Sequence, residues 1–146
     1  MAMALMLSLF AGAAFAAVKI GNAEPNRLVG TGNNDVLRGL GGNDKLYGRG
    51  DGDRLYGGAG RDLLVGGDDH DLLVGGAGRD LILARDGDTD RINCGAGRDT
   101  VRADRDDRVA KNSENVRKSR TPQRTVPMLP TALTITATTV PAINKQ

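Results

Sequence analysis

The sequence has few of the residues that build an ordinary globular core. Its 146 residues include no tryptophan, two tyrosines, two phenylalanines and a single cysteine, Cys94. The length suits one domain, but so few large apolar side chains cannot fill the core of a typical globular domain. A single cysteine also excludes an intramolecular disulfide, so another source of stability is needed.

Residues that carry catalysis are equally scarce. His70 is the only histidine, and residues 30–83 contain no serine. The usual pairs of a nucleophile and a base therefore cannot be assembled, and His70 is interpreted as a solvent-facing loop residue. We predict that the protein is not an enzyme.

The two ends of the chain differ from its middle. Residues 1–17 are apolar but short for a membrane span, and "AFA" at 14–16 has the small residues of a signal-peptide cleavage site. We predict a signal peptide over 1–17, cleaved near Ala16 or Ala17, and thus a secreted protein with no stable membrane span. Its n-region is atypical because no Lys or Arg precedes Lys19, and an uncleaved anchor is the alternative. Residues 117–146, rich in Thr, Pro, Arg and Lys, are predicted to form a disordered tail.

The net charge of +2 hides an uneven distribution. Residues 30–92 hold twelve aspartates against eight Lys and Arg, whereas residues 93–146 hold five acidic and ten basic residues. The basic part has no aromatic residue on which bases could stack, and its arginines alternate with aspartates, so we expect no binding to nucleic acid.

A nine-residue repeat fills the acidic middle of the chain. From Gly30 it reads GTGNNDVLR, GLGGNDKLY, GRGDGDRLY, GGAGRDLLV, GGDDHDLLV and GGAGRDLIL. Position one is always glycine, position six always aspartate and position eight always aliphatic. The position-eight residues are Leu37, Leu46, Leu55, Leu64, Leu73 and Ile82.

This periodicity predicts an all-β solenoid. Positions one to six have the composition of a turn, and positions seven to nine form a short strand whose middle residue points inward. If two repeats make one coil, Leu37, Leu55 and Leu73 stack in one sheet and face the other three position-eight residues across the interior. The aspartates would then stack as well and repel one another, unless a cation lies between them.

The repeat resembles the hemolysin-type calcium-binding repeat of the repeats-in-toxin (RTX) family, G-G-x-G-x-D-x-U-x, which GGAGRDLLV and GGAGRDLIL match at every fixed position. The resemblance implies a right-handed parallel β-roll that folds on binding several Ca²⁺ ions, with about four best-supported sites. Each ion would be held between turns one coil apart, by aspartate carboxylates and glycine carbonyls. The implied ligands are Asp35, Asp44, Asp53, Asp62, Asp71 and Asp80, with Gly39, Gly41, Gly48, Gly50, Gly57, Gly60, Gly66, Gly75 and Gly78; Asp51, Asp69, Asp90 and Asp99 are further candidates.

The repeats are imperfect near both ends. Three early repeats replace the glycine of position two by Thr31, Leu40 and Arg49, and three repeats replace that of position four by Asn33, Asp51 and Asp69, which we expect to strain the turn. Residues 18–29 are expected to add a degenerate first half-coil, with Asn26 as a site without charge, ahead of the six repeats of residues 30–83.

After Leu83 one extra residue breaks the register, and residues 84–116 are interpreted as degenerate closing coils. The segment from Asp86 has the first three carboxylates of an EF-hand loop but lacks its glycine and glutamate, so that interpretation fails. The segment also resembles the closing segments of small secreted repeat proteins of actinobacterial type. In those a second cysteine stands where Ser113 is found here, which implies that Cys94 is a free or intermolecular thiol.

The later repeats place apolar residues on the outside of the roll. Leu63, Val65, Leu81 and Leu83 would form one patch, covered either by residues 132–140 of the tail or by a second copy or another protein. The predicted function is a secreted calcium-binding protein. The alternative is a transport or folding appendage, or an adhesion module, that acts through a partner.

Overall fold

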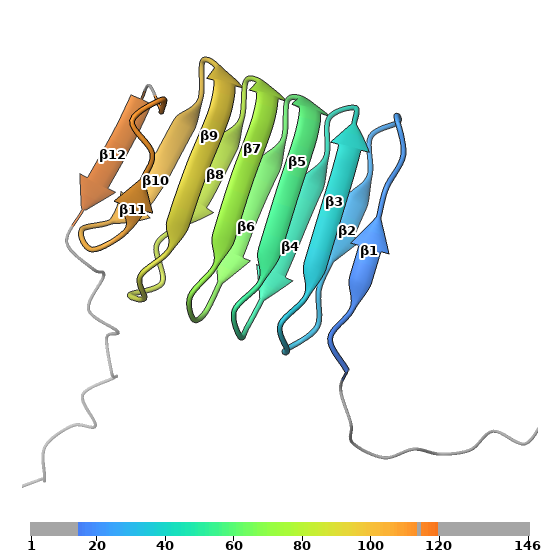
Figure 1. Cartoon of the computed structure of the whole chain (residues 1–146), viewed down its shortest axis with the longest axis horizontal. Helices are drawn as coiled ribbons and strands as arrows, with labels where there is room; N and C mark the ends of the chain where they lie inside the picture. Colours follow the sequence, from blue (N-terminus) through green and yellow to red (C-terminus); the bar gives the residue numbers. More distant parts are fainter. Residues whose placement is uncertain (1–14, 114, 120–146) are drawn as a thin grey trace, which may run out of the picture.

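The computed structural model describes residues 15–113 and 115–119, and this part of the chain contains twelve β-strands and no helix (Figure 1). Most of the predicted signal peptide, most of the predicted tail and its segment 132–140 lie outside the described residues. Within the described ranges there is no helix that is long and apolar enough to cross a membrane.

The strands form two parallel six-stranded sheets. Sheet A contains β1 (Val18–Ile20), β3 (Val36–Gly41), β5 (Arg54–Gly60), β7 (Leu72–Gly78), β9 (Arg91–Gly97) and β11 (Arg108–Val109). Sheet B contains β2 (Arg27–Val29), β4 (Lys45–Arg49), β6 (Leu63–Gly67), β8 (Leu81–Ala84), β10 (Thr100–Asp104) and β12 (Asn115–Ser119). Successive strands alternate between the sheets, so two repeats make one coil, as the periodicity predicts.

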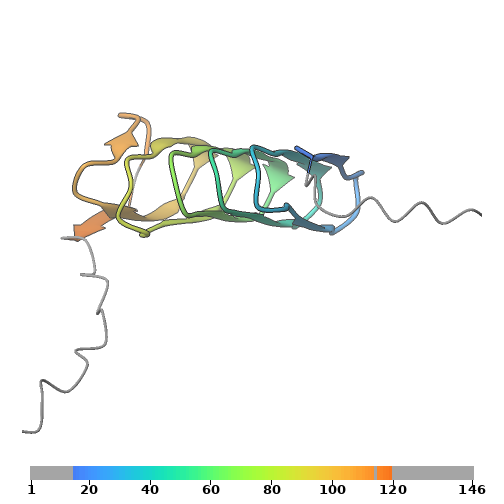
Figure 2. The same cartoon turned by 90° about the horizontal axis from the view of Figure 1, so that it is seen from below.

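The two sheets lie face to face as the layers of a flattened roll (Figure 2). In Figure 1 the strands of sheet A run upward in front, those of sheet B run downward behind, and the coils advance to the left. This path is a right-handed coil, and the predicted parallel β-roll is confirmed.

A single column of aliphatic side chains fills each inner sheet face. Leu37 pairs with Leu55 and Leu55 with Leu73 in sheet A, while Leu46, Leu64 and Ile82 pair in the same way in sheet B. All six side chains are completely buried. The predicted register is therefore confirmed, and the closing coils continue it with Ile92 and Val101.

A lysine occupies the inward position at each end of this interior. Lys19 of β1 pairs with Leu37, and its Nζ donates a hydrogen bond to the carbonyl of Val29 in the other sheet. Lys118 of β12 pairs with the buried Ala103, and its Nζ donates to the carbonyl of Asp107 at 2.7 Å. Lys19 thus ends the column next to Leu37, and Lys118 places an ammonium group beside the other end, where Val116 continues the column by pairing with Val101.

The last strand reaches further than expected. We predict a disordered tail from Arg117, but β12 continues to Ser119 because Arg117 and Lys118 pair with Arg102 and Ala103 of β10. Pairing with an existing edge strand satisfies the backbone there, although the composition of the segment indicates disorder.

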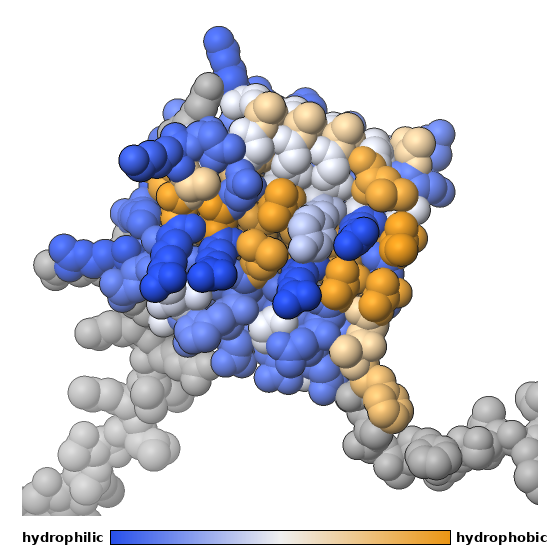
Figure 3. All heavy atoms as spheres, viewed as in Figure 1, coloured by the Kyte–Doolittle hydropathy of each residue, from blue (hydrophilic) through white to orange (hydrophobic). Residues whose placement is uncertain are grey.

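The outer faces of the two sheets carry both charged and apolar side chains. On sheet A, whose outer face Figure 3 shows, Arg54 and Arg91 flank the half-buried Leu72. The half-buried Val74 lies between Tyr56 and Asn93. On sheet B, Leu63 pairs with Leu81 and Val65 with Leu83, which confirms that the four predicted apolar residues lie together. Leu81 is 36% exposed and the other three are half-buried.

Several turns contain side chains where the backbone favours glycine. Regular repeats have positive φ at positions two and four, as at Gly58 (114°) and Gly60 (140°). Leu40 (80°), Arg49 (100°), Asp51 (59°) and Asp69 (75°) adopt the same region. The strain expected at these four residues is therefore confirmed, whereas Thr31 and Asn33 have no positive φ.

Leu40→Gly should stabilise the roll. The Leu40 side chain is 53% exposed, so its loss removes little packing, while the strain of a branched residue at positive φ is relieved. We expect the free energy of unfolding in millimolar calcium to rise by about 0.5–1 kcal/mol, after the larger unfolded-state entropy of glycine is subtracted. Lys45→Gly, in an extended strand, is the matched control and should lower it by a similar amount. Urea unfolding of both variants measures the two effects, and a loss of stability in Leu40→Gly contradicts the assigned strain.

Candidate metal centre

Two ladders of aspartates follow the two edges of the roll. Each strand of the regular coils begins directly after a position-six aspartate, so these residues stack one coil apart. One ladder, at the lower edge in Figure 1, consists of Asp35, Asp53, Asp71, Asp90 and Asp107; the other consists of Asp44, Asp62, Asp80 and Asp99. All nine are at most 3% exposed.

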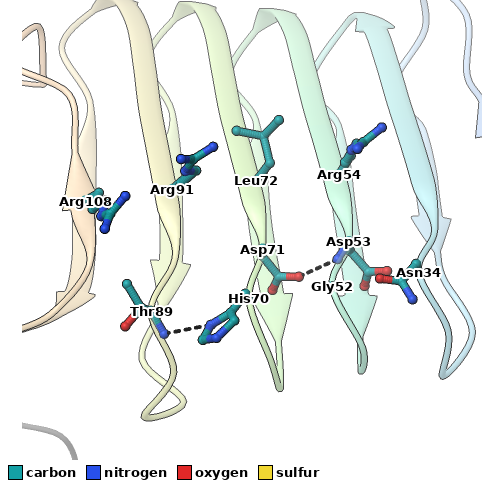
Figure 4. A pocket seen from close by; sticks show the side chains of 10 residues that line it. All are labelled: Asn34, Gly52, Asp53, Arg54, His70, Asp71, Leu72, Thr89, Arg91 and Arg108. Carbon is teal, nitrogen blue, oxygen red and sulfur yellow. Dashed lines mark hydrogen bonds between the residues drawn. The ribbon is translucent and has the colours of Figure 1, made fainter.

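One carboxylate oxygen of each aspartate is used to hold the ladder together. The backbone N–H of Asp35 donates to Oδ1 of Asp53 at 2.7 Å, and that of Asp53 donates to Oδ1 of Asp71 at 2.7 Å (Figure 4). On the other edge Asp44 donates in the same way to Asp62 at 2.8 Å. These hydrogen bonds fix the carboxylates in place but use only one of the two oxygens of each carboxylate.

The second carboxylate oxygen is buried without a partner. Within the described residues, Oδ2 has no hydrogen bond in Asp44, Asp53, Asp62, Asp71, Asp80, Asp90 and Asp99. Burial of an unsatisfied polar oxygen costs a few kcal/mol, and more when the group is charged. Seven such oxygens in two regular rows indicate a ligand that the protein itself does not supply.

The glycine of position one provides the space beside this oxygen. At Gly57 an added Cβ would lie 2.5 Å from Oδ2 of Asp62 and 2.5 Å from the carbonyl oxygen of Gly75, one coil further on. Gly30, Gly39, Gly48 and Gly75 show the same approach of a carboxylate and a carbonyl, and at Gly75 the carbonyl is that of Cys94. Convergent carboxylate and carbonyl oxygens suit a hard cation such as calcium, so these residues fit the implied ion.

The structure separates the glycines that we expect to act as ligands into two groups. The carbonyls of Gly39, Gly48, Gly57, Gly66 and Gly75 face the position-one glycine of the preceding coil. The carbonyl of Gly60 instead accepts a hydrogen bond from the backbone N–H of Arg79 at 3.2 Å, which makes this carbonyl less available as a calcium ligand. For Gly41 and Gly78, at the ends of β3 and β7, and for Gly50 no such approach to a carboxylate is found. The ligand role of all these residues remains a prediction.

The additional candidates also differ in position. Asp90 and Asp99 continue the two ladders into the closing coils, where their N–H partners are Asp71 and Asp80. Asp51 is exposed, and so is Asp69, whose N–H donates to Oδ2 of Asp88 at 3.2 Å. Asn26 lies at the first rung: its N–H donates to Oδ1 of Asp44, and its own Oδ1 lies beside Gly21.

One carboxylate near the ladder does not follow from the repeat. Asp86 belongs to the irregular turn between β8 and β9, and it lies close to Asp71 and Asp90. The sequence gives one signal for this position: the extra residue in the turn, which indicates that the turn does not follow the regular path.

A shallow groove of about 620 Å³ runs along the lower ladder (Figure 4). His70 lies on its wall and accepts a hydrogen bond at Nδ1 from the N–H of Thr89 at 3.2 Å. Arg54, Arg91 and Arg108 lie on the sheet side of the groove. His70 thus contributes to the turn, in an exposed loop as expected.

Cys94 takes position one in the first closing coil. Its thiol is free and completely buried, and it lies next to Ser113, the residue that corresponds to a cysteine in the closing segments described above. Burial raises the pKa of the thiol, which keeps it protonated and unreactive.

The fold and the ladders define a class of protein: a parallel β-roll whose glycine turns present stacked aspartates to a cation. A family model described as the RTX calcium-binding nonapeptide repeat (4 copies) matches residues 20–55, 47–82 and 65–101, which together span more than half of the chain. The chain therefore belongs to the RTX, or hemolysin-type, calcium-binding repeat family. No curated protein and no solved structure matches it.

Without an ion, the ladders favour protonated carboxylates. Burial raises the pKa of Asp53 and of Asp80 to about 6, that of Asp71 to about 7 and that of Asp90 to about 8, partly offset by the N–H bond that each accepts. Neighbouring aspartates raise these pKa values further.

Acid should therefore stabilise the calcium-free roll. Because the folded-state pKa values exceed the ordinary value of 3.8, the folded state binds more protons than the unfolded state. The free energy of unfolding in calcium-free buffer should be highest below about pH 4, should fall as the pH rises from about 4 to 8, and should level off above the folded-state pKa values. Unfolding followed by circular dichroism across this range measures it. A calcium-free protein that gains stability between pH 5 and 8 contradicts this view of the ladders.

Proposed function

We propose that the protein is a secreted, non-enzymatic calcium-binding protein whose roll folds when several calcium ions bind between its turns. The single observation that carries this proposal is the row of buried, unpartnered Oδ2 oxygens in the two ladders. Secretion is supported by the signal-peptide pattern of residues 1–17.

The position-six aspartates and the position-one carbonyls would hold the ions. A divalent cation supplies the positive charge that the stacked carboxylates lack. Five glycines have both oxygens in place, compared with about four best-supported sites expected from the motif. In the folded roll, one coil contributes backbone carbonyls and the neighbouring coil a carboxylate that is fixed by the N–H group from which it accepts, so both kinds of ligand are held in place once the roll has formed.

The energetics favour a folding switch. Extracellular calcium modules bind with dissociation constants of ~10⁻⁴–10⁻³ M. At ten times the dissociation constant, each site adds about 1.4 kcal/mol to the free energy of unfolding. Several sites together supply as much as the whole stability of a small domain, so calcium outside the cell would decide whether the roll is folded.

A role that depends on a protein partner is the second candidate. It is favoured by the apolar residues Leu63, Val65, Leu81 and Leu83 on adjacent strands of sheet B, next to a groove of about 450 Å³ that Arg85 and Arg102 also line. We propose that this patch receives a second copy or another protein once the roll is folded, as an adhesion module or a folding appendage requires.

Calcium should switch the β-structure of the protein on. We expect the far-UV circular dichroism spectrum to be that of a disordered chain in chelator and to gain β signal cooperatively in millimolar calcium, but not in equal magnesium, because magnesium keeps its water and demands a smaller octahedral site. Renewed chelation should reverse the change. An unchanged β signal in chelator, or a chain still disordered at about 10 mM calcium, contradicts the proposed function.

A further inference from the structure

The turn between β8 and β9 brings three carboxylates together. Asp71, Asp86 and Asp90 each offer an oxygen, and these oxygens lie within 4.8 Å of one another. Asp71 and Asp90 are successive members of the lower ladder, whereas Asp86 comes from the irregular turn itself. No other group of three possible metal ligands of this kind is found in residues 15–113 and 115–119.

One extra residue creates this arrangement. Leu55 pairs with Leu73, 18 residues on, but Leu72 pairs with Arg91, 19 residues on, so the turn before β9 is longer than the turns of the regular coils. At the regular Gly48, an added Cβ would meet the carbonyl of Gly66 as well as Asp53. At Gly66 the three nearest atoms all belong to Asp71. The carbonyl that faces position one in the regular turns is therefore missing from the nearest atoms at Gly66, the glycine whose counterpart one coil on leads into the longer turn.

The buried oxygens give independent evidence for a ligand. Asp71 is 2% exposed and Asp90 is completely buried, and the Oδ2 atoms of both have no hydrogen-bond partner in the described part of the chain. Their Oδ1 atoms accept the N–H groups of Asp53 and Asp71. Both side chains are therefore held in place with one unpartnered oxygen each, in a group of carboxylates that also includes Asp86.

The next coil fixes the turn from the other side. The N–H of Gly87 donates to Oδ2 of Asp104 at 2.9 Å, and the N–H of Asp90 donates to Oδ1 of Asp107 at 2.9 Å. Within the turn, Oδ1 of Asp86 accepts the N–H of Asp88 at 2.8 Å. Asp86 is thus oriented by its own turn rather than left as a freely rotating surface side chain.

The geometry points to a calcium site of a second kind, in which Asp71, Asp86 and Asp90 bind one ion more tightly than the regular turns do. Three carboxylates bring more negative charge to the ion than the carboxylates and neutral carbonyls of a regular turn, and ligand charge is one of the quantities that set calcium affinity. This inference rests on the proposed function, because it assumes that the ladders bind calcium at all.

Calorimetric titration of the full protein with calcium at neutral pH tests the site. The wild type should show one tight binding event followed by a weaker class of several ions. Asp86→Asn should weaken the tight event about tenfold or more and leave the weaker class unchanged. Asp68→Asn is the matched control, since exposed Asp68 takes the same turn position one coil earlier, and it should behave like the wild type.

The outcomes separate this inference from the proposed function. A wild type that binds no calcium overturns both. A wild type that binds calcium, with Asp86→Asn retaining every binding event at unchanged affinity, overturns only the three-carboxylate site. Asp86→Glu keeps the charge and should retain the tight event. If neither Asp86 variant reaches the β signal of the wild type in saturating calcium, Asp86 has a structural role and the inference is likewise wrong.

Discussion

The structure depends on the burial of carboxylates in two continuous columns. Each position-six aspartate is fixed by a hydrogen bond to the coil before it, and this bond also sets the spacing of the coils. The same arrangement leaves a second oxygen buried without a partner in seven of the aspartates. Like charges at this spacing repel one another in a medium of lowered dielectric constant. The ladders therefore stabilise the roll only when protons or cations neutralise them.

The remaining features of the repeat follow from this constraint. Position one is glycine in the regular repeats because a Cβ would fill the space next to the carboxylate, and the aliphatic residue of position eight supplies a narrow interior that cannot hold the fold together by itself. Each coil contacts only its neighbours, so the coils are coupled through the interfaces between neighbours, where the strands pair and the aspartates stack. The closing coils relax the rule, with Ala84 and Cys94 in position one, and Lys19 and Lys118 place ammonium groups at the two ends of the roll.

Much of this architecture could be predicted from the sequence because its period is exact in six successive repeats. The inward residues, the two aspartate ladders and the apolar patch on sheet B follow from counting by nine and eighteen. The strain at Leu40 and Arg49 also follows, since glycine occupies the same position in the regular repeats. These predictions need only the repeat and the alternation of side chains along a strand.

The rest depends on places where the period fails. The insertion after Leu83 is visible in the sequence, but which side chain it brings beside Asp71 depends on the path of the lengthened turn, so Asp86 could not be assigned. Lys19 is an unexpected residue for an inward position, and only the pairing with Leu37 shows that it ends the interior. The extent of β12 was missed because the composition of residues 117–119 resembles the tail, while the edge of β10 provides a partner for them.

The central claim is that the ladders destabilise the empty roll and stabilise the calcium-bound one, and paired unfolding of the wild type and Asp62→Asn tests it most directly. The amide keeps an oxygen that can accept the N–H of Asp44 but removes one negative charge from the ladder. In calcium-free buffer at pH 8 the variant should retain more β signal than the wild type, and in millimolar calcium it should have the lower free energy of unfolding. A variant with less β signal than the wild type in calcium-free buffer, or with an unchanged free energy of unfolding in calcium, would contradict the account.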